Sequence, residues 1–138
     1  MSSKKIESSK APEPVGLYPH ARQLGSLLFL SGVGPREKGT KKIPGVELDA
    51  AGNILSYDIE TQCHSVFNNV RAIVEESGSC WGKVVDVTVF LTNMKDDFAT
   101  YNRIYAEYFV ENQPCRTTVE IKSLPTPIAI ELKVIATI

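Results

Sequence analysis

Residues 84–92 read VVDVTVFLT, a strongly β-branched run. Side chains of this type favour the pleated surface of a β-strand. Alternate residues of a strand point to opposite faces, and one parity here is apolar: Val85, Val87, Val89 and Leu91. The other parity mixes polar and aromatic side chains: Asp86, Thr88, Phe90 and Thr92. We therefore predict a strand with one buried face and one mixed face.

Two segments with helical periodicity flank this strand in the sequence. Asp58 can cap a helix that runs to about Ser77. A second helix, capped by Asp96 or Asp97, runs to about Val110. In both segments apolar residues recur at three- and four-residue steps, which indicates one apolar helix face. The stripes are Ile59, Cys63, Val66, Phe67, Val70, Ile73 and Val74, and then Phe98, Tyr101, Tyr105, Tyr108 and Phe109.

Further strands are predicted nearer the two ends of the chain. The short apolar run at 27–31 (LLFLS) ends in turn-forming residues, and residues 116–121 and 128–137 form the last two strands. Residues 36–57 form a loop with a short hairpin around residues 51–53. Two amphipathic helices and at least four strands pack most simply as an α+β fold, with both helices on one face of a single mixed sheet. The Ser-, Lys- and Pro-rich residues 1–14 are predicted as a flexible arm, and residues 15–138 as one domain.

The last strand also has two unlike faces. Its even-numbered residues from 130 to 136 are apolar, whereas Glu131 and Lys133 lie on the opposite face. No further element of the chain is left to cover the mixed face of the sheet. Either that face meets water, or copies of the chain close over it, and its composition suits a subunit interface. If the last two strands are neighbours, Arg116 and Glu131 lie on the same side of the sheet.

Composition excludes several classes of protein. The 15 basic and 16 acidic side chains nearly balance, and no Lys/Arg stripe is present, which disfavours nucleic-acid and anionic-membrane partners. The chain has no apolar run of membrane-spanning length and no hydrophobic signal region near its first residue. Its three widely spaced cysteines indicate a reducing, cytoplasmic setting. His20 and His64 are isolated and no cluster has ligand spacing, so we expect no metal site.

Arg116 is the most specific single candidate for chemistry. It opens a predicted strand, and its planar guanidinium suits bidentate capture of a carboxylate. From the residues alone, a structural ion pair with Glu131 is an equally good interpretation. His20 lies in a predicted loop beside Tyr18, and from the residues alone the interpretation as a surface residue is favoured over a role in a site.

Several spaced motifs resemble the RidA (YjgF/YER057c/UK114) family. The string PCRTTVE at 114–120, followed by Leu124-Pro125 and by IEL at 130–132, is similar to its C-terminal signature. GLYPHA at 16–21, LFLSG at 28–32, TVFL at 88–91 and FATYN at 98–102 are similar to its other segments. The resemblance implies a homotrimer of chorismate-mutase-like subunits with clefts at the subunit boundaries. It also implies that Arg116 grips a substrate carboxylate and that Glu131 lies beside the reacting carbon. The cleft-lining residues implied are Tyr18, Ser31 and Asn102.

Some residues depart from the general family pattern. Pro19 and His20 stand where typical members have Ser-Gln, Arg36 follows the strand end, and the loop at 37–57 is longer than usual. These features resemble the 2-aminomuconate deaminase branch, which implies hydrolysis of an enamine dicarboxylate, with release of ammonia and without a cofactor. Arg36, His20 or Arg22 would then take the distal carboxylate. The alternatives are a general 2-iminoacid deaminase, acting on substrates such as 2-aminoacrylate, and a non-catalytic trimer that binds small carboxylates.

Overall fold

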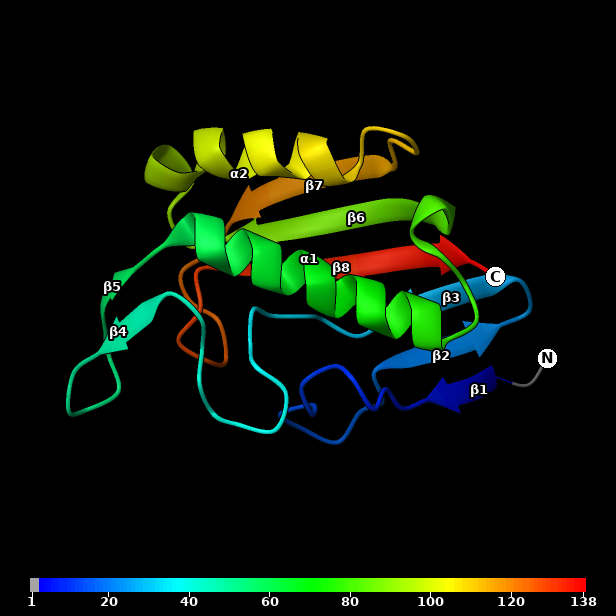
Figure 1. Cartoon of the computed structure of the whole chain (residues 1–138), viewed down its shortest axis with the longest axis horizontal. Helices are drawn as coiled ribbons and strands as arrows, with labels where there is room; N and C mark the ends of the chain where they lie inside the picture. The colour runs from blue at the N-terminus through cyan, green and yellow to red at the C-terminus, as the bar shows by residue number, and fades with distance from the viewer. Residues whose placement is uncertain (1–2) are drawn as a thin grey trace.

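The computed structural model describes residues 3–138, which form one six-stranded mixed sheet with two helices on one face (Figure 1). The strand order is β1-β2-β3-β8-β6-β7, with β6 and β7 parallel and every other neighbouring pair antiparallel. This arrangement confirms the predicted α+β class. The sheet strands are β1 (Ser3–Ile6), β2 (Ala21–Leu24), β3 (Leu27–Leu30), β6 (Val84–Leu91), β7 (Cys115–Glu120) and β8 (Ile130–Thr137).

The two helices are α1 (Ile59–Glu76) and α2 (Met94–Tyr108), with a short 3-10 turn η1 (Trp81–Lys83) after α1. Asp58 caps α1 as predicted, because its side chain accepts from the backbone N–H of Glu60. The predicted cap of α2 is wrong. Asn93 takes that position and accepts from the N–H of Asp96, so both aspartates lie in the first turn, where the helix dipole favours negative charge.

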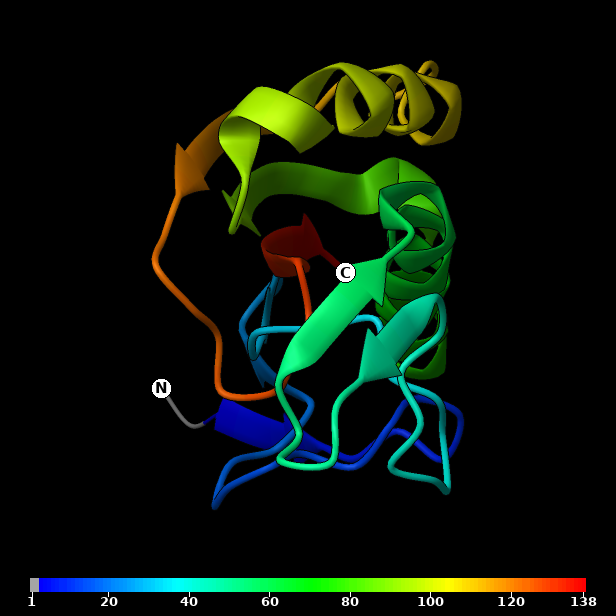
Figure 2. The ribbon, with the colours of Figure 1, turned by 90° about the vertical axis from the view of Figure 1, so that its left-hand side faces the viewer.

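A separate hairpin, β4 (Val46–Leu48) and β5 (Ile54–Tyr57), confirms the turn predicted around residues 51–53. It lies at the end of the molecule opposite to the C-terminus (Figures 1 and 2). One side chain ties it to the main body: the Tyr57 hydroxyl donates to the carboxylate of Asp97 over 2.6 Å. Asp97 is only 5% exposed, and burial raises its pKa above the usual range.

Most predicted helix and strand faces are buried as expected, with two local exceptions. In β6 the residues Val87, Val89 and Leu91 are buried, but a bulge between Val84 and Asp86 turns Val85 toward solvent. In α2, Phe98 remains more than one-third exposed, while Tyr101 and Tyr105 pack into the core. The even-numbered residues of β8 lie under the helices, as predicted.

The last two strands are not neighbours, because β6 lies between β7 and β8. Arg116 pairs with Val87, whose side chain lies on the helix-covered face. Glu131 pairs with Phe90, which lies on the opposite face. Paired residues share a face of a sheet, so the prediction that Arg116 and Glu131 lie on the same side is wrong within one chain.

The predicted flexible arm at 1–14 is also wrong for residues 3–14, while residues 1–2 lie outside the described part of the chain. Residues 3–6 form β1, which pairs with β2 at the edge of the sheet. Ser8, Ala11 and Pro12 are buried against the rest of the chain. Composition indicated disorder because these residues bury little apolar surface by themselves. Their order comes instead from hydrogen bonds to residues far away in the sequence.

Candidate functional site

Glu131 lies in a pocket of about 130 Å³ on the face of the sheet away from the helices. A glycine makes room for its carboxylate: a Cβ on Gly32 would lie 2.7 Å from Oε2 of Glu131. Gly32 therefore lets the backbone approach the carboxylate closely. The lining residues are Val15, Tyr18, Gly32, Gly34, Arg36, Pro125, Thr126, Ile128 and Glu131.

The electrostatics of Glu131 suit proton transfer. Burial raises the pKa of its carboxyl group above the usual value, while the positive charge of Arg36 acts in the opposite direction. A raised carboxyl pKa brings the protonated and ionised forms closer in population near neutral pH. The group can therefore accept a proton from water and return it.

Arg36 shares the pocket with Glu131 and is held by two neighbouring segments. The amide of Asn69, on α1, donates to the carbonyl oxygens of Gly34 and Arg36, each over 2.9 Å. The guanidinium Nη2 donates to the carbonyl of Glu13 over 2.6 Å. Arg36 also lines a groove of about 1110 Å³ that runs beneath the hairpin. Arg36 thus borders both the small pocket and this larger space.

Tyr18 and Ser31, the other residues expected on this side, differ in what their hydroxyl groups do. Tyr18 is 39% exposed, lines the Glu131 pocket and accepts from the N–H of Val15 over 3.2 Å. Ser31 donates its hydroxyl to the carbonyl of Pro19 over 2.7 Å. The Ser31 hydroxyl therefore fixes the preceding loop, and the residue borders a cavity of about 20 Å³ next to the Glu131 pocket.

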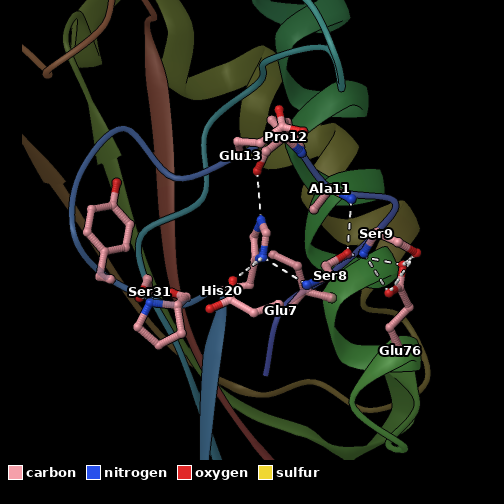
Figure 3. Close-up of polar contacts among 12 residues, drawn as sticks. Glu7, Ser8, Ser9, Ala11, Pro12, Glu13, His20, Ser31 and Glu76 are labelled. Atoms are coloured by element: carbon pink, nitrogen blue, oxygen red, sulfur yellow. Dashed lines mark hydrogen bonds and ion pairs between the residues drawn. The ribbon is translucent and has the colours of Figure 1, made fainter. Parts of the chain in front are cut away.

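His20 is not free to bind a ligand, which corrects the prediction of a substrate-binding role. Its side chain is buried, and both ring nitrogens contact backbone groups of the N-terminal segment (Figure 3). Nδ1 accepts from the N–H of Ser8 over 2.8 Å, and Nε2 lies 2.8 Å from the carbonyl of Pro12. Since Nδ1 is the acceptor, the proton sits on Nε2, which donates to Pro12.

Arg116 lies on the other face of the sheet, at the edge strand β7, where α2 forms a cradle around it. Its Nη1 donates to the side-chain oxygen of Asn102 over 2.8 Å. The guanidinium carbon lies 4.7 Å from the ring centre of Tyr105 and 5.4 Å from that of Tyr101. Arg116 and Asn102 therefore belong together, as the sequence resemblance implied, but they lie apart from Glu131 within one chain.

The sequence patterns did not indicate that the two tyrosines of this cradle contact a functional residue. Tyr101 and Tyr105 were predicted as core residues, and they are buried. The signal was present in their i, i+4 spacing around Asn102, which places the three side chains on adjoining parts of one helix. Burial raises the pKa of both tyrosines, so they remain neutral beneath the guanidinium.

Within residues 3–138, no three His, Cys, Asp or Glu side chains gather as a metal-binding group. In the same residues, no helix has the length and apolar character that crossing a membrane requires.

A family model described as Endoribonuclease L-PSP matches residues 8–138, nearly the whole chain. The chain belongs to this family. It is the RidA/YjgF family that the sequence motifs resemble. A RutC family protein of Pyrococcus abyssi is 38% identical over 136 residues, which cover 99% of this chain and 98% of that protein. Escherichia coli TdcF, which carries the name reactive intermediate deaminase, is 35% identical over 134 residues, covering 95% and 94% of the two chains.

Solved structures from the family share the fold. The crystal structure of yeast YEO7 superposes with a TM-score of 0.86 at 29% identity, covering 99% of this chain and 98% of that one. The crystal structure of E. coli TdcF with bound serine gives 0.84 at 33% identity, covering 98% of both chains. Two helices packed on one mixed sheet are thus common to this chain and these family members.

Proposed function

We propose that this chain is a cofactor-independent deaminase of small imine or enamine carboxylic acids, with 2-aminomuconate as its substrate. The observation that carries the proposal is the single pocket shared by Glu131, Tyr18 and Arg36. It combines a carboxyl group of raised pKa with a guanidinium, around a space that fits a small carboxylic acid. We further propose that it works in the cytoplasm, in keeping with its three free cysteines.

A complete site needs a second copy of the chain in this proposal. Arg116 of one copy would meet Glu131 of a neighbouring copy in a homotrimer. The helix-free face of the sheet supports self-association, because Leu24, Leu27 and Val119 are 39%, 40% and 36% exposed on it. An exposed sheet face that mixes apolar and polar side chains is typical of a surface that a partner covers.

The proposed reaction is a hydrolysis. The enamine tautomerises to an imine, water adds to the imine carbon to form a C–O bond, and the C–N bond breaks to release ammonia and a 2-oxo acid. Glu131 accepts a proton from the attacking water and passes it to the imine nitrogen, which gives a carbinolamine. As the C–N bond breaks, the hydroxyl proton of the carbinolamine moves to the departing nitrogen and a C=O bond remains. Arg116 pairs with the carboxylate next to the imine carbon, which holds that carbon in place beside the water.

Arg36 is the group proposed to bind the distal carboxylate of 2-aminomuconate. Of the three cationic residues that the sequence offered, His20 is buried with both nitrogens bonded, and Arg22 donates to Ser3 on the neighbouring strand. Arg36 lines the pocket together with Glu131. A second carboxylate bound there would orient a dicarboxylate across the reacting carbon.

The relatives support the reaction type more than the substrate. TdcF carries the name reactive intermediate deaminase, and its structure contains serine, a small amino acid. The description of the family names an endoribonuclease, but the formal net charge of −1 lacks the basic excess typical of nucleic-acid binding. The competing interpretation within the same class is a general 2-iminoacid deaminase, and a non-catalytic carboxylate-binding trimer is the competitor outside it.

Ammonia release by the purified, chelator-treated protein tests the proposal. Freshly generated 2-aminomuconate and 2-aminoacrylate are compared as substrates, with Arg36→Ala beside the wild type. We expect turnover of both, a higher kcat/KM for the dicarboxylate, and loss of that preference in Arg36→Ala. Equal values for both substrates would favour the general 2-iminoacid deaminase, and binding without turnover would favour the non-catalytic trimer.

A further inference from the structure

We infer that His20 is a positioning residue that holds Arg36 through the backbone of Pro12 and Glu13, and so sets the preference for a second carboxylate. The inference rests on the proposed function, because it takes Arg36 as the group that binds the distal carboxylate. His20 itself touches no substrate in this view. It acts through one peptide unit of the N-terminal segment.

The first link is the contact between His20 and Pro12. The imidazole is 7% exposed, and its Nε2 donates to the Pro12 carbonyl over 2.8 Å (Figure 3). The tautomer that makes this bond is set by Ser8, whose N–H occupies Nδ1 over 2.8 Å. The ring is therefore held in one orientation by hydrogen bonds at both nitrogens.

The second link runs from Pro12 to Arg36. The Pro12 carbonyl belongs to the same planar peptide unit as the nitrogen of Glu13, so fixing one fixes the position of the other. The next carbonyl, that of Glu13, accepts from Nη2 of Arg36 over 2.6 Å. His20 and Arg36 thus hold two successive carbonyl groups of the chain.

Other contacts secure this segment and do not depend on His20. Glu76 of α1 accepts from the N–H of Ser9 over 2.8 Å and from the Ser8 hydroxyl over 3.1 Å. The Glu13 carboxylate pairs with Lys38. Because these contacts remain when His20 is changed, its loss should loosen residues 12 and 13 without unfolding the domain.

Replacing His20 by Gln or by Asn tests its two hydrogen bonds one at a time, because each amide side chain can take the place of only one ring nitrogen. In His20→Gln the amide nitrogen can reach the place of Nε2 and donate to Pro12. In His20→Asn the shorter amide can replace only Nδ1 and accept from Ser8. Glu7→Gln is the matched control, since the Glu7 carboxylate lies 3.6 Å from Nδ1 and contributes nothing to the bond with Pro12.

Steady-state kinetics with 2-aminomuconate and 2-aminoacrylate give the readout. We expect His20→Asn to raise KM for the dicarboxylate about tenfold, with kcat and the monocarboxylate KM unchanged, as for a loss of uniform binding. His20→Gln and Glu7→Gln should stay within about twofold of the wild type. Equal effects of the Asn and Gln variants, or equal effects on both substrates, would overturn the inference.

A backbone variant keeps the test decisive if His20→Asn folds poorly. Pro12→Gly leaves the histidine in place and frees the chain between the two held carbonyls, so it should produce the same selective rise in KM. Failure of this inference is distinguishable from failure of the proposed function. If Arg36→Ala alone raises the dicarboxylate KM, the role of His20 is wrong. If Arg36→Ala has no effect, the role of Arg36 is wrong as well.

Discussion

Mixing two inactive variants tests whether the site is divided between copies of the chain. Arg116→Ala lacks the guanidinium and Glu131→Gln lacks the carboxylate, so each variant alone should be nearly inactive. Within one chain the two side chains lie on opposite faces of the sheet, with β6 between their strands. The proposed active site therefore combines Arg116 from one copy with Glu131 from another.

The expected magnitude follows from the symmetry of the assembly. In a closed ring each interface combines the Arg116 side of one subunit with the Glu131 side of the next. When the two variants are mixed equally and assemble at random, one interface in four receives both intact residues. Activity should recover to about one quarter of the wild-type value, independent of the number of subunits in the ring.

The assay is ammonia release after the two variants are unfolded together, refolded and compared with each variant refolded alone. Size-exclusion chromatography confirms that the mixture has the assembly state of the wild type. Recovery near one quarter supports a shared site. A mixture no more active than its parents, although fully assembled, would refute the division of the site between copies.

Three further predictions concern the pocket and the hairpin. Glu131→Gln should slow turnover about a hundredfold. Because burial raises the pKa of Glu131, the stability of the wild type relative to this variant should fall as pH rises above 4.5, which paired melting curves at pH 4 and 7 would detect. Gly32→Ala should displace the Glu131 carboxylate and lower kcat about a hundredfold with little change in Tm, measured by kinetics and calorimetry. Tyr57→Phe should cost about 1–3 kcal/mol in urea unfolding, because the buried Asp97 loses its hydrogen bond.

Local sequence signals predicted the helices and most strands of this fold. Asp58 and the three- and four-residue spacing after it suffice for α1, because capping and amphipathicity act within a few residues. Strand order is different. The position of β6 between β7 and β8 depends on pairings between residues 29 to 52 positions apart in the chain. Alternation within a strand carries no information about its neighbours.

The sequence placed the candidate residues in one site, whereas the structure of one chain divides them. Arg116 with Asn102, and Glu131 with Tyr18 and Arg36, form two separate groups in one chain. The role of His20 could not be read from sequence, because both of its partners are backbone groups of a segment whose composition indicated disorder. Because the partners of such a histidine are backbone groups, no motif of side-chain types in the sequence indicates its role.

Glu131, the proposed acid, and Arg36, the residue proposed to select the substrate, lie on very different parts of the structure. Glu131 projects from β8, where its backbone pairs with Phe90 of β6 on one side and the adjoining Leu132 bonds to Val33 on the other, so this part of the strand is held from both sides. Arg36 sits on a connecting loop that is tethered by Asn69 and by the Glu13 carbonyl. Loops accept insertion and substitution more readily than central strands. Descendants of such a chain can therefore acquire new substrates through changes in the tether, while the carboxyl group proposed as the acid stays in place on its central strand.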